Sequence, residues 1–355
     1  MTSVVITICC AFALSIIAVL SILKICHKNS WYDRINERKI HTGNIPRLGG
    51  ISFALVFILC ALFINFFLIK PRFSGRFLFP LSGLIIVLIS GVLDDFRSMQ
   101  PRHKLLIQII AGLCVIVPGF SFQQLLFEEA SPIWLRYPVS LLWIIGLTNA
   151  INLIDGVDGL AGGTAFFAAL TYAAVFALNG IDSVVLLCIC LAAAIGGFLV
   201  FNLPLPKARI FMGDGGSQFL GFILAVLPLV ETRRPGTIPQ NLPLPYAAAI
   251  LSIPIFDTFA AIWRRLRDGR RIDSPDKAHI HHKLMNLKLP ARGVDGVLYG
   301  LQILIGVMVF LSVKWEGIVS FFLLAASFFI VILFFSLIHF LNQSAAKKMM
   351  KLIQS

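Results

Sequence analysis

The sequence has little charge. Only 13% of its 355 residues are Asp, Glu, Lys or Arg, whereas 58% are hydrophobic. A soluble globular domain has about 25% charged and about 45–50% apolar residues, so this composition excludes an ordinary soluble protein. Acidic residues are fewer than basic ones, with 17 Asp and Glu against 30 Lys and Arg. We predict a polytopic membrane protein whose net charge of +13 favours contact with anionic lipids or anionic substrates.

Several other features are absent. The seven cysteines form no CxxC pair and lie in or beside apolar runs, which disfavours a zinc site or a disulfide framework. No positive residue precedes the first apolar run, and Lys24 and Lys28 follow it, so we do not expect a secretory signal there. The basic residues lie in short connections, which argues against nucleic acid as a partner. With no internal repeat or soluble segment, residues 1–355 are predicted to form one integral-membrane domain.

Long apolar runs make up most of the chain. A helix needs about 20 apolar residues to cross a bilayer about 30 Å thick. On this basis we predict an all-α membrane bundle with about eleven transmembrane helices. Their approximate ranges are 4–24, 49–69, 77–93, 104–119, 135–151, 160–178, 183–201, 216–231, 245–262, 296–313 and 318–341.

Lys and Arg are unevenly divided between the two sides of this bundle. Because cytoplasmic connections carry an excess of Lys and Arg, the pattern predicts an amino terminus outside and a carboxyl terminus in the cytoplasm. The unusual polar clusters fall on the same side, so we expect a site at the cytoplasmic face. The basic connections are 25–48, 94–103, 202–215 and 263–295, with the tail 342–355.

The stretch NAINLIDGVDGLAGG, residues 149–163, is the most unusual polar segment. It places Asp155, Asp158 and the amides Asn149 and Asn152 beside long apolar runs. Charges at a bilayer edge are costly to bury without a partner, and the glycines leave the backbone open to a ligand or another helix. A solvated loop between two helices is the alternative. It does not explain so many acids and glycines in a short connection, so we predict a functional site.

A second acidic cluster ends the predicted helix 77–93. Asp94 and Asp95 point about 100° apart if they are helical, so they need not share one task. Acids at the carboxyl end of a helix oppose its dipole, which disfavours a purely stabilising role, although a helix end that meets water is the simpler interpretation. Oxygen ligands would favour Mg²⁺ or Mn²⁺ over zinc. Arg102 and Lys104 follow and are candidates to bind a phosphate.

The stretch FMGDGGS, residues 211–217, opens another predicted helix. Glycine turns before a helix expose N–H groups that attract anions. Asp214 would repel a bare phosphate but suits one that carries its metal, so we predict that Asp214 ligates Mg²⁺ bridging a diphosphate. For this motif alone, an ordinary Asp or Ser helix cap is an equally good interpretation.

The connection 263–295 carries His279, His281 and His282 beside many basic residues. Adjacent side chains diverge on a helix or strand, so we favour phosphate contact over metal binding for them. The neighbouring arginines have a simpler explanation as topology signals and contacts with anionic lipids. Asp257 lies inside the predicted span 245–262, where an acid is a functional candidate by default.

Together these clusters suit phosphoryl transfer between two anionic substrates. Such reactants repel each other, so a metal ion and cations have to neutralise them and hold the attack in line. A site at the edge of a bilayer indicates one water-soluble substrate and one lipid.

The motifs resemble those of the polyprenyl-phosphate N-acetylhexosamine-1-phosphate transferases, and the undecaprenyl-phosphate N-acetylglucosamine-1-phosphate transferases most closely. They lie between residues 38 and 285, with two further spans and the tail after them. The phospho-muramoyl-pentapeptide branch is less similar, because it carries a PxHHHFE-like run where this chain has HIHHKLM. The matching stretches are RKIHTGNIPRLGGIS, GVLDDF with PRHK, NLIDGVDGLAGG, FMGDGGS, and PIFDTFAAIWRRL with SPDKAHIHHKL.

The resemblance implies a reaction and a location. A UDP-N-acetylhexosamine, with N-acetylglucosamine as the best guess, would give its sugar-1-phosphate to undecaprenyl phosphate and release UMP, with Mg²⁺ as cofactor and Mn²⁺ as an alternative. The product would start a lipid-linked surface glycan such as O-antigen, common antigen or teichoic acid. The enzyme would lie in the bacterial inner membrane with its active site on the cytoplasmic face. A homodimer is left open.

The resemblance also implies residue roles. The predicted catalytic acids are Asp94, Asp95, Asp155 and Asp158, and Asp257 is a predicted substrate-binding residue. Asp94 and Asp95 would lie near the lipid phosphate and the metal, with Asp94 as the candidate base or phosphate organiser. Lys104, with Arg102, would bind the acceptor phosphate. Arg97 and Ser98 depart from the residues often found after the acid pair, which leaves the role of that turn open.

The resemblance implies a second group of residues that would bind the donor. Asn152, Asp155 and Asp158 would line the nucleotide pocket, Phe211 would stack on uracil, and Asp214 would ligate Mg²⁺. The histidines His279, His281 and His282 would contact the diphosphate or sugar.

Two other functions fit a membrane protein with acidic motifs. A membrane prenyltransferase would need NDxxDxxxD-like spacing on two helices, and neither copy is present. A secondary transporter would hold its ionisable residues near the middle of the bilayer in broken helices, whereas only Asp257 lies well within a predicted span.

Overall fold

The computed structural model describes residues 2–33, 45–68, 75–126, 130–178, 180, 182–203, 205–230, 241–274, 276, 278–315 and 317–354. Within these ranges every regular element is a helix, which confirms the predicted all-α class. The first motif lies partly outside the described residues, because its positions 38–44 are not among them.

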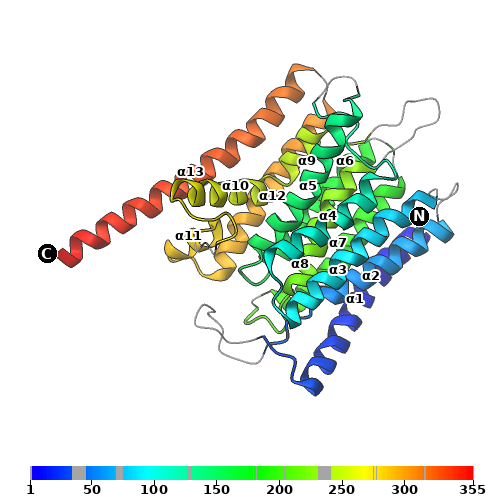
Figure 1. Ribbon diagram of the computed structural model, residues 1–355, viewed down its shortest axis with the longest axis horizontal. Helices are drawn as coiled ribbons and strands as arrows, with labels where there is room; N and C mark the ends of the chain where they lie inside the picture. The colour runs from blue at the N-terminus through cyan, green and yellow to red at the C-terminus, as the bar shows by residue number, and fades with distance from the viewer. Residues whose placement is uncertain are drawn as a thin grey trace.

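The helices follow one another along the chain and pack into one bundle (Figure 1). Short π or 3₁₀ segments are η1 (Ile64–Leu68), η2 (Gly75–Phe77) and η3 (Leu227–Leu229). The α-helices are α1 (Thr2–Asn29), α2 (Gly50–Phe63), α3 (Leu78–Phe96), α4 (Pro101–Ile116), α5 (Ile133–Ile154), α6 (Leu160–Leu178), α7 (Asp182–Asn202), α8 (Gly213–Val226), α9 (Leu244–Ile250), α10 (Ser252–Arg267), α11 (Ile280–Asn286), α12 (Ala291–Lys314) and α13 (Ile318–Gln354).

Eight of the described helices are long and apolar enough to cross a membrane, and the bent pair α9 and α10 makes up to nine. Helices α4 and α8 have only 16 and 14 residues and fall short of this length, although both overlap predicted ranges. A multi-pass membrane protein is therefore confirmed. The number eleven and the orientation of the termini stay predictions. The range 342–354, predicted as a tail, continues α13 as helix and projects beyond the other helices (Figure 1).

The predicted span 245–262 is wrong in one respect, because it is not one straight helix. Helices α9 and α10 meet at 85°. A continuous helix would need an N–H at residue 254, and Pro254 has none; in α10 it occupies the first turn, where no such donor is required. The carbonyl of Ile250 at the break accepts a hydrogen bond from Gln302 Nε2 on α12, at 2.9 Å. The bend is therefore satisfied by a buried amide from another helix.

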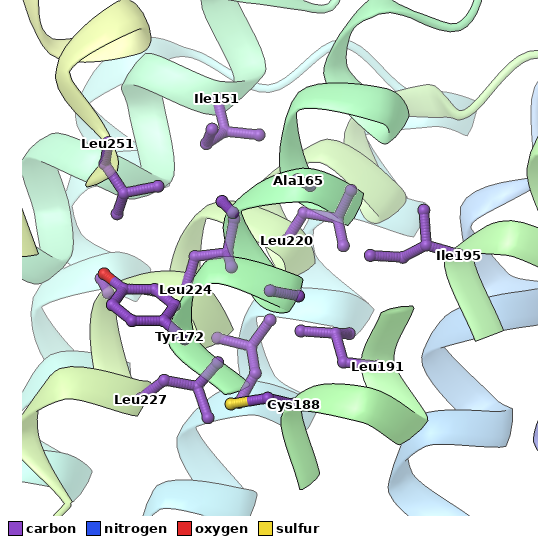
Figure 2. Packing of buried hydrophobic residues seen from close by; sticks show 14 of the residues in the cluster. Ile151, Ala165, Tyr172, Cys188, Leu191, Ile195, Leu220, Leu224, Leu227 and Leu251 are labelled. Atoms are coloured by element: carbon purple, nitrogen blue, oxygen red, sulfur yellow. The ribbon is translucent and has the colours of Figure 1, made fainter. Parts of the chain in front are cut away.

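The centre of the bundle is formed by α6, α7 and α8. In the most apolar 18-residue stretches of α6 and α7, 72% of the residues are buried. The corresponding share is 22% in α1 and 17% in α13, which lie at the periphery. Figure 2 shows Leu191 and Ile195 of α7 close to Leu220 of α8 in this core. Helix α8 packs against both α3 and α5, so its start is fixed relative to the ends of those helices.

Glycines let two helices approach the first turn of α8 closely. A Cβ at Gly91 of α3 would lie 2.5 Å from the Cα of Gly215, and one at Gly50 of α2 would overlap the Cα of Gly216. Real Cβ atoms do not approach backbone so closely, so these positions require glycine. The contact fixes the turn that carries Asp214.

Candidate active site

Side chains from three helices meet around Asp214. Asn152 near the end of α5 donates from Nδ2 to Asp214 Oδ1 at 3.1 Å and to Ser217 Oγ at 2.8 Å. Lys104 in the first turns of α4 forms an ion pair with Asp94 and lies 3.7 Å from Asp214 Oδ2. The turns predicted to converge from distant parts of the chain are therefore on the same side of the bundle.

Asp95 caps the amino-terminal end of α8. Its Oδ1 accepts a hydrogen bond from the N–H of Asp214 at 2.8 Å, and its Oδ2 accepts one from Gly215 at 3.0 Å. A carboxylate at a helix amino terminus satisfies free N–H groups and complements the dipole. The structure thus puts Asp95 in a supporting position behind Asp214, and its predicted catalytic role stays a prediction.

Arg47 belongs to this cluster and was not assigned a role from the sequence. Its Nε lies 3.0 Å from Asp95, its Nη2 lies 3.4 Å from Asp214, and its Nη1 lies 3.7 Å from Asp33. Burial lowers the pKa of Arg47, but the surrounding carboxylates outweigh it and raise that pKa overall. The available signal was a lone arginine between Pro46 and the glycines that open α2.

Asp94 is only 4% exposed and both of its oxygens are engaged. Oδ1 accepts a hydrogen bond from the N–H of Met99 at 2.6 Å, and Oδ2 pairs with Lys104. Lys104 therefore lies between two acids, one on α3 and one on α8. This arrangement holds the ammonium group at the edge of the site.

A cavity of about 470 Å³ adjoins the cluster. It brings together acids, a base and an aromatic ring, as nucleotide and phosphate recognition requires. Asp155 follows the last residue of α5, and burial, with Asp214 and Asp158 nearby, raises the pKa of its carboxyl to about 8. The charged, histidine and aromatic residues on the wall are Asp33, Arg47, Asp155, Asp158, Phe211, Asp214 and His282.

The three histidines divide into different environments. His282 lines the cavity, whereas His281 is 2% exposed and packs against Gly156, where a Cβ would overlap its ring. Burial lowers the pKa of His281 to about 4, so this ring is neutral near pH 7. His279 is also buried and does not line the cavity.

Asp257 explains the position of His279. Its Oδ2 lies 2.8 Å from His279 Nδ1, and its Oδ1 accepts a hydrogen bond from the N–H of Ile280 at 2.8 Å. One carboxylate on α10 therefore orients the histidine and caps the start of α11. The substrate-binding roles predicted for Asp257 and His279 stay predictions, and the structure gives both residues a supporting position.

Other residues lie differently from expectation or were missed. Arg102 stays exposed in the first turn of α4 and is not among the residues of the cavity wall. Asn202 at the end of α7 accepts from the N–H of Gly159 at 2.9 Å and donates to the carbonyl of Ile210 at 2.9 Å, which ties two site turns together. Asp295 on α12 is 4% exposed, and neither carboxylate oxygen has a hydrogen-bond partner among the described residues.

The residues fit a magnesium ion that arrives with its ligand. No group of three or more His, Cys, Asp or Glu in the described part of the chain could by itself hold a metal ion. Mg²⁺ commonly uses one or two carboxylates and completes its shell with water and substrate phosphates. Asp214 could supply such a carboxylate, because it lines the cavity, its side chain is 23% exposed, and Asn152 Nδ2 orients its Oδ1 at 3.1 Å.

The bundle gathers acids, cations and a glycine turn beside one cavity, an arrangement suited to an integral-membrane transferase. The family model described as glycosyl transferase family 4 matches residues 77–231. Relatives with an assigned function match most of the chain as well. The chain belongs to glycosyl transferase family 4.

Three relatives show the extent of the similarity. A probable undecaprenyl-phosphate N-acetylglucosaminyl 1-phosphate transferase of Bacillus subtilis (strain 168) is 35% identical, over 81% of this chain and 80% of its own length. The undecaprenyl-phosphate alpha-N-acetylglucosaminyl 1-phosphate transferase of Escherichia coli (strain K12) is 30% identical, over 76% and 73%. A decaprenyl-phosphate N-acetylglucosaminephosphotransferase of Mycobacterium leprae (strain TN) is 31% identical, over 80% and 74%.

Proposed function

We propose that this protein transfers N-acetylglucosamine-1-phosphate from UDP-N-acetylglucosamine to undecaprenyl phosphate and releases UMP. The observation that carries the proposal is the position of Asp214, between Lys104 and Arg47 and on the wall of a cavity large enough for a ligand. The names of the relatives supply the sugar and the lipid. The product would begin a lipid-linked surface glycan of the bacterial envelope.

The cations prepare the site for two anions. Two phosphorylated substrates repel each other, and Lys104 and Arg47 lie where they would offset that repulsion. Lys104 faces both Asp94 and Asp214, so it is suited to the acceptor phosphate while Asp94 holds it in place. A phosphate is already ionised at neutral pH, so we assign Asp94 the task of organising Lys104 and the phosphate.

The cavity would hold the donor. Phe211 offers a ring for uracil, Asp155 and Asp158 offer hydrogen-bonding groups for the nucleoside, and His282 offers one for the sugar or diphosphate. We propose that Asp214, supported by Asn152, holds Mg²⁺, which when bound would offset the charge of the diphosphate. Asp95 and Arg47 would keep the first turn of α8 in position during transfer.

The location follows from the same proposal. The excess of Lys and Arg on one side supports an active site at the cytoplasmic face of the inner membrane. Transport is a weaker proposal, because the acids gather at helix ends around a cavity and the family consists of transferases.

The test is an assay with purified protein in nanodiscs. Protein, undecaprenyl phosphate, Mg²⁺ and UDP-N-acetylglucosamine labelled in the sugar are expected to yield labelled lipid and an equal amount of UMP. A panel of UDP-N-acetylhexosamines fixes the sugar, and a chelator followed by Mg²⁺ or Mn²⁺ fixes the metal. The variant Asp268→Asn removes an exposed acid that pairs with Arg267, so it is the control for acid-to-amide substitutions in the site and should retain activity. Absence of labelled lipid with every donor would contradict the proposal, and uptake of labelled sugar by the protein reconstituted in closed vesicles would favour transport.

A further inference from the structure

Three side-chain amides form a network inside the bundle. Asn149 of α5 donates from Nδ2 to Gln108 Oε1 on α4 at 2.7 Å, and Gln108 Nε2 faces Asn149 Oδ1 at 3.3 Å. Gln108 Nε2 also reaches Gln218 Oε1 on α8 at 3.4 Å. Gln108 and Gln218 are each 2% exposed. The network therefore joins three helices through uncharged groups, of which Gln108 and Gln218 are buried and Asn149 is half-buried.

Each amide lies about one helical turn from a residue of the charged cluster. Gln108 is four residues after Lys104 on α4, Gln218 is four residues after Asp214 on α8, and Asn149 is three residues before Asn152 on α5. Residues three or four apart lie on the same face of a helix. The amide network thus repeats, one turn deeper in the bundle, the meeting of the same three helices that builds the site.

The chemistry of these residues indicates a role in positioning. Apolar side chains of similar size would pack in a buried bundle without needing partners, whereas buried amides fix a specific pairing. In the charged layer above them, Lys104 and Arg47 offset the repulsion among Asp94, Asp95 and Asp214, and this balance would shift when anionic ligands bind. Lys104 must also reach acids on two other helices. Because the amide network is uncharged, it can keep α4, α5 and α8 in register whether or not ligands occupy the site.

We propose that Gln108, Asn149 and Gln218 are positioning residues that hold Lys104, Asn152 and Asp214 at the spacing the metal–diphosphate complex requires. The inference rests on the proposed function of the site, since it concerns the same ligands. It assigns no contact with substrate to the three amides. They act through the next turn of their own helices.

The test compares apolar replacements of two buried amides. Gln108→Leu breaks the network, and Asn65→Leu removes a buried amide in η1, outside it. We expect Gln108→Leu to lower kcat by about 10- to 100-fold and to raise the Mg²⁺ concentration for half-maximal activity, because small displacements of catalytic groups are costly. Asn65→Leu should leave both quantities unchanged.

A second pair of measurements separates positioning from folding. The stabilisation of purified protein by UDP with Mg²⁺, read as a shift in Tm, should shrink in Gln108→Leu even if its Tm without ligand is unchanged. The double variant Gln108→Leu with Asn149→Leu should be no worse than the poorer single variant, because the residues act as one unit. The inference would be overturned if the Gln108→Leu variant had the same kcat, the same Mg²⁺ concentration for half-maximal activity and the same ligand-induced shift in Tm as the wild type. Failure of the wild-type protein to make product would instead overturn the proposed function, and the shift measurement would still report on the network.

Discussion

The two ends of α8 face very different cavities. Gly213 and Asp214 at its start line the charged cavity of about 470 Å³, and Phe222 and Val226 toward its end line an apolar cavity of about 180 Å³. Arg76 is the one charged group among the described residues around the apolar cavity. At the charged end, each contact joins a particular donor to a particular acceptor. At the apolar end, the walls need only be hydrophobic and of suitable size, so the two ends should respond differently to substitution.

The largest effect should come from Asp214→Asn. The amide keeps the shape and still accepts a hydrogen bond from Asn152, but it removes the charge that faces Arg47 and Lys104. We expect turnover to fall by about 10³-fold or more, since preorganised charge is often the largest contribution to catalysis. The labelled-lipid assay measures the loss, and gel filtration with Tm checks that the protein still folds and inserts. Normal activity in this variant would remove the proposed metal ligand.

A smaller but still clear effect is expected from Gly50→Ala. The added methyl group would overlap the backbone of Gly216, so α2 or the first turn of α8 has to move. Overpacking of this kind costs about 1–3 kcal/mol, and we expect Tm to fall together with a roughly 10-fold loss of activity. Gly146→Ala is the matched control, because nothing lies within 4 Å of its added methyl group. Equal Tm and activity in the two variants would show that the close approach does not position the site.

The part of the site that the sequence predicted is the part carried by local patterns. Asp94, Asp155 and Asp214 stand out because acids are scarce and each falls at the end of an apolar run beside glycines. Their gathering on one side follows from counting spans and charges. The helices follow from the same runs, although α4 and α8 proved shorter than a typical span and α10 turned away from α9.

The remainder depends on contacts between distant residues, which no local pattern records. Nothing near Asp95 in the sequence indicates that it caps a helix more than a hundred positions later. Asp257 was noticed as an acid in an apolar run, but its partner His279 is brought to it only by the fold. Arg47 and Gln108 resemble any arginine near a span or any polar residue within one. Their significance appears only when α3, α4, α5 and α8 are placed together.

The pH dependence of stability should report on the charged end, because Asp155 lines the cavity there. The pKa of Asp155 is about 8 in the folded protein, whereas an unfolded aspartate titrates near pH 4. Between these values the folded state binds more protons than the unfolded state, so stability falls as pH rises from about 4 to about 8. For one group this slope is at most about 1.4 kcal/mol per pH unit.

The comparison for that effect is Asp155→Asn, which cannot ionise. Thermal unfolding of ligand-free protein at pH 5, 6, 7 and 8 should show a steeper fall of Tm for the wild type than for the variant. Above pH 8 the two curves should become parallel, because the carboxyl is then ionised in both states of the wild type. Parallel curves over the whole range would mean that the carboxyl titrates normally and is not held neutral by its surroundings.

The smallest effect should come from filling the apolar cavity with Ala61→Leu. Ala61 of α2 is buried and lines that cavity, so apolar space lies beside it for the added carbons. Burial of apolar surface is favourable and a tight fit is not, so we expect stability to change by less than about 1 kcal/mol and turnover to stay within about twofold. Ala61 and Gly50 lie on the same helix, so the two variants compare substitutions near the two ends of α2 in the same assays. A loss of turnover with Ala61→Leu as large as that with Gly50→Ala would mean that the apolar end also sets the geometry of the charged end, and the contrast between the two ends of α8 would no longer hold.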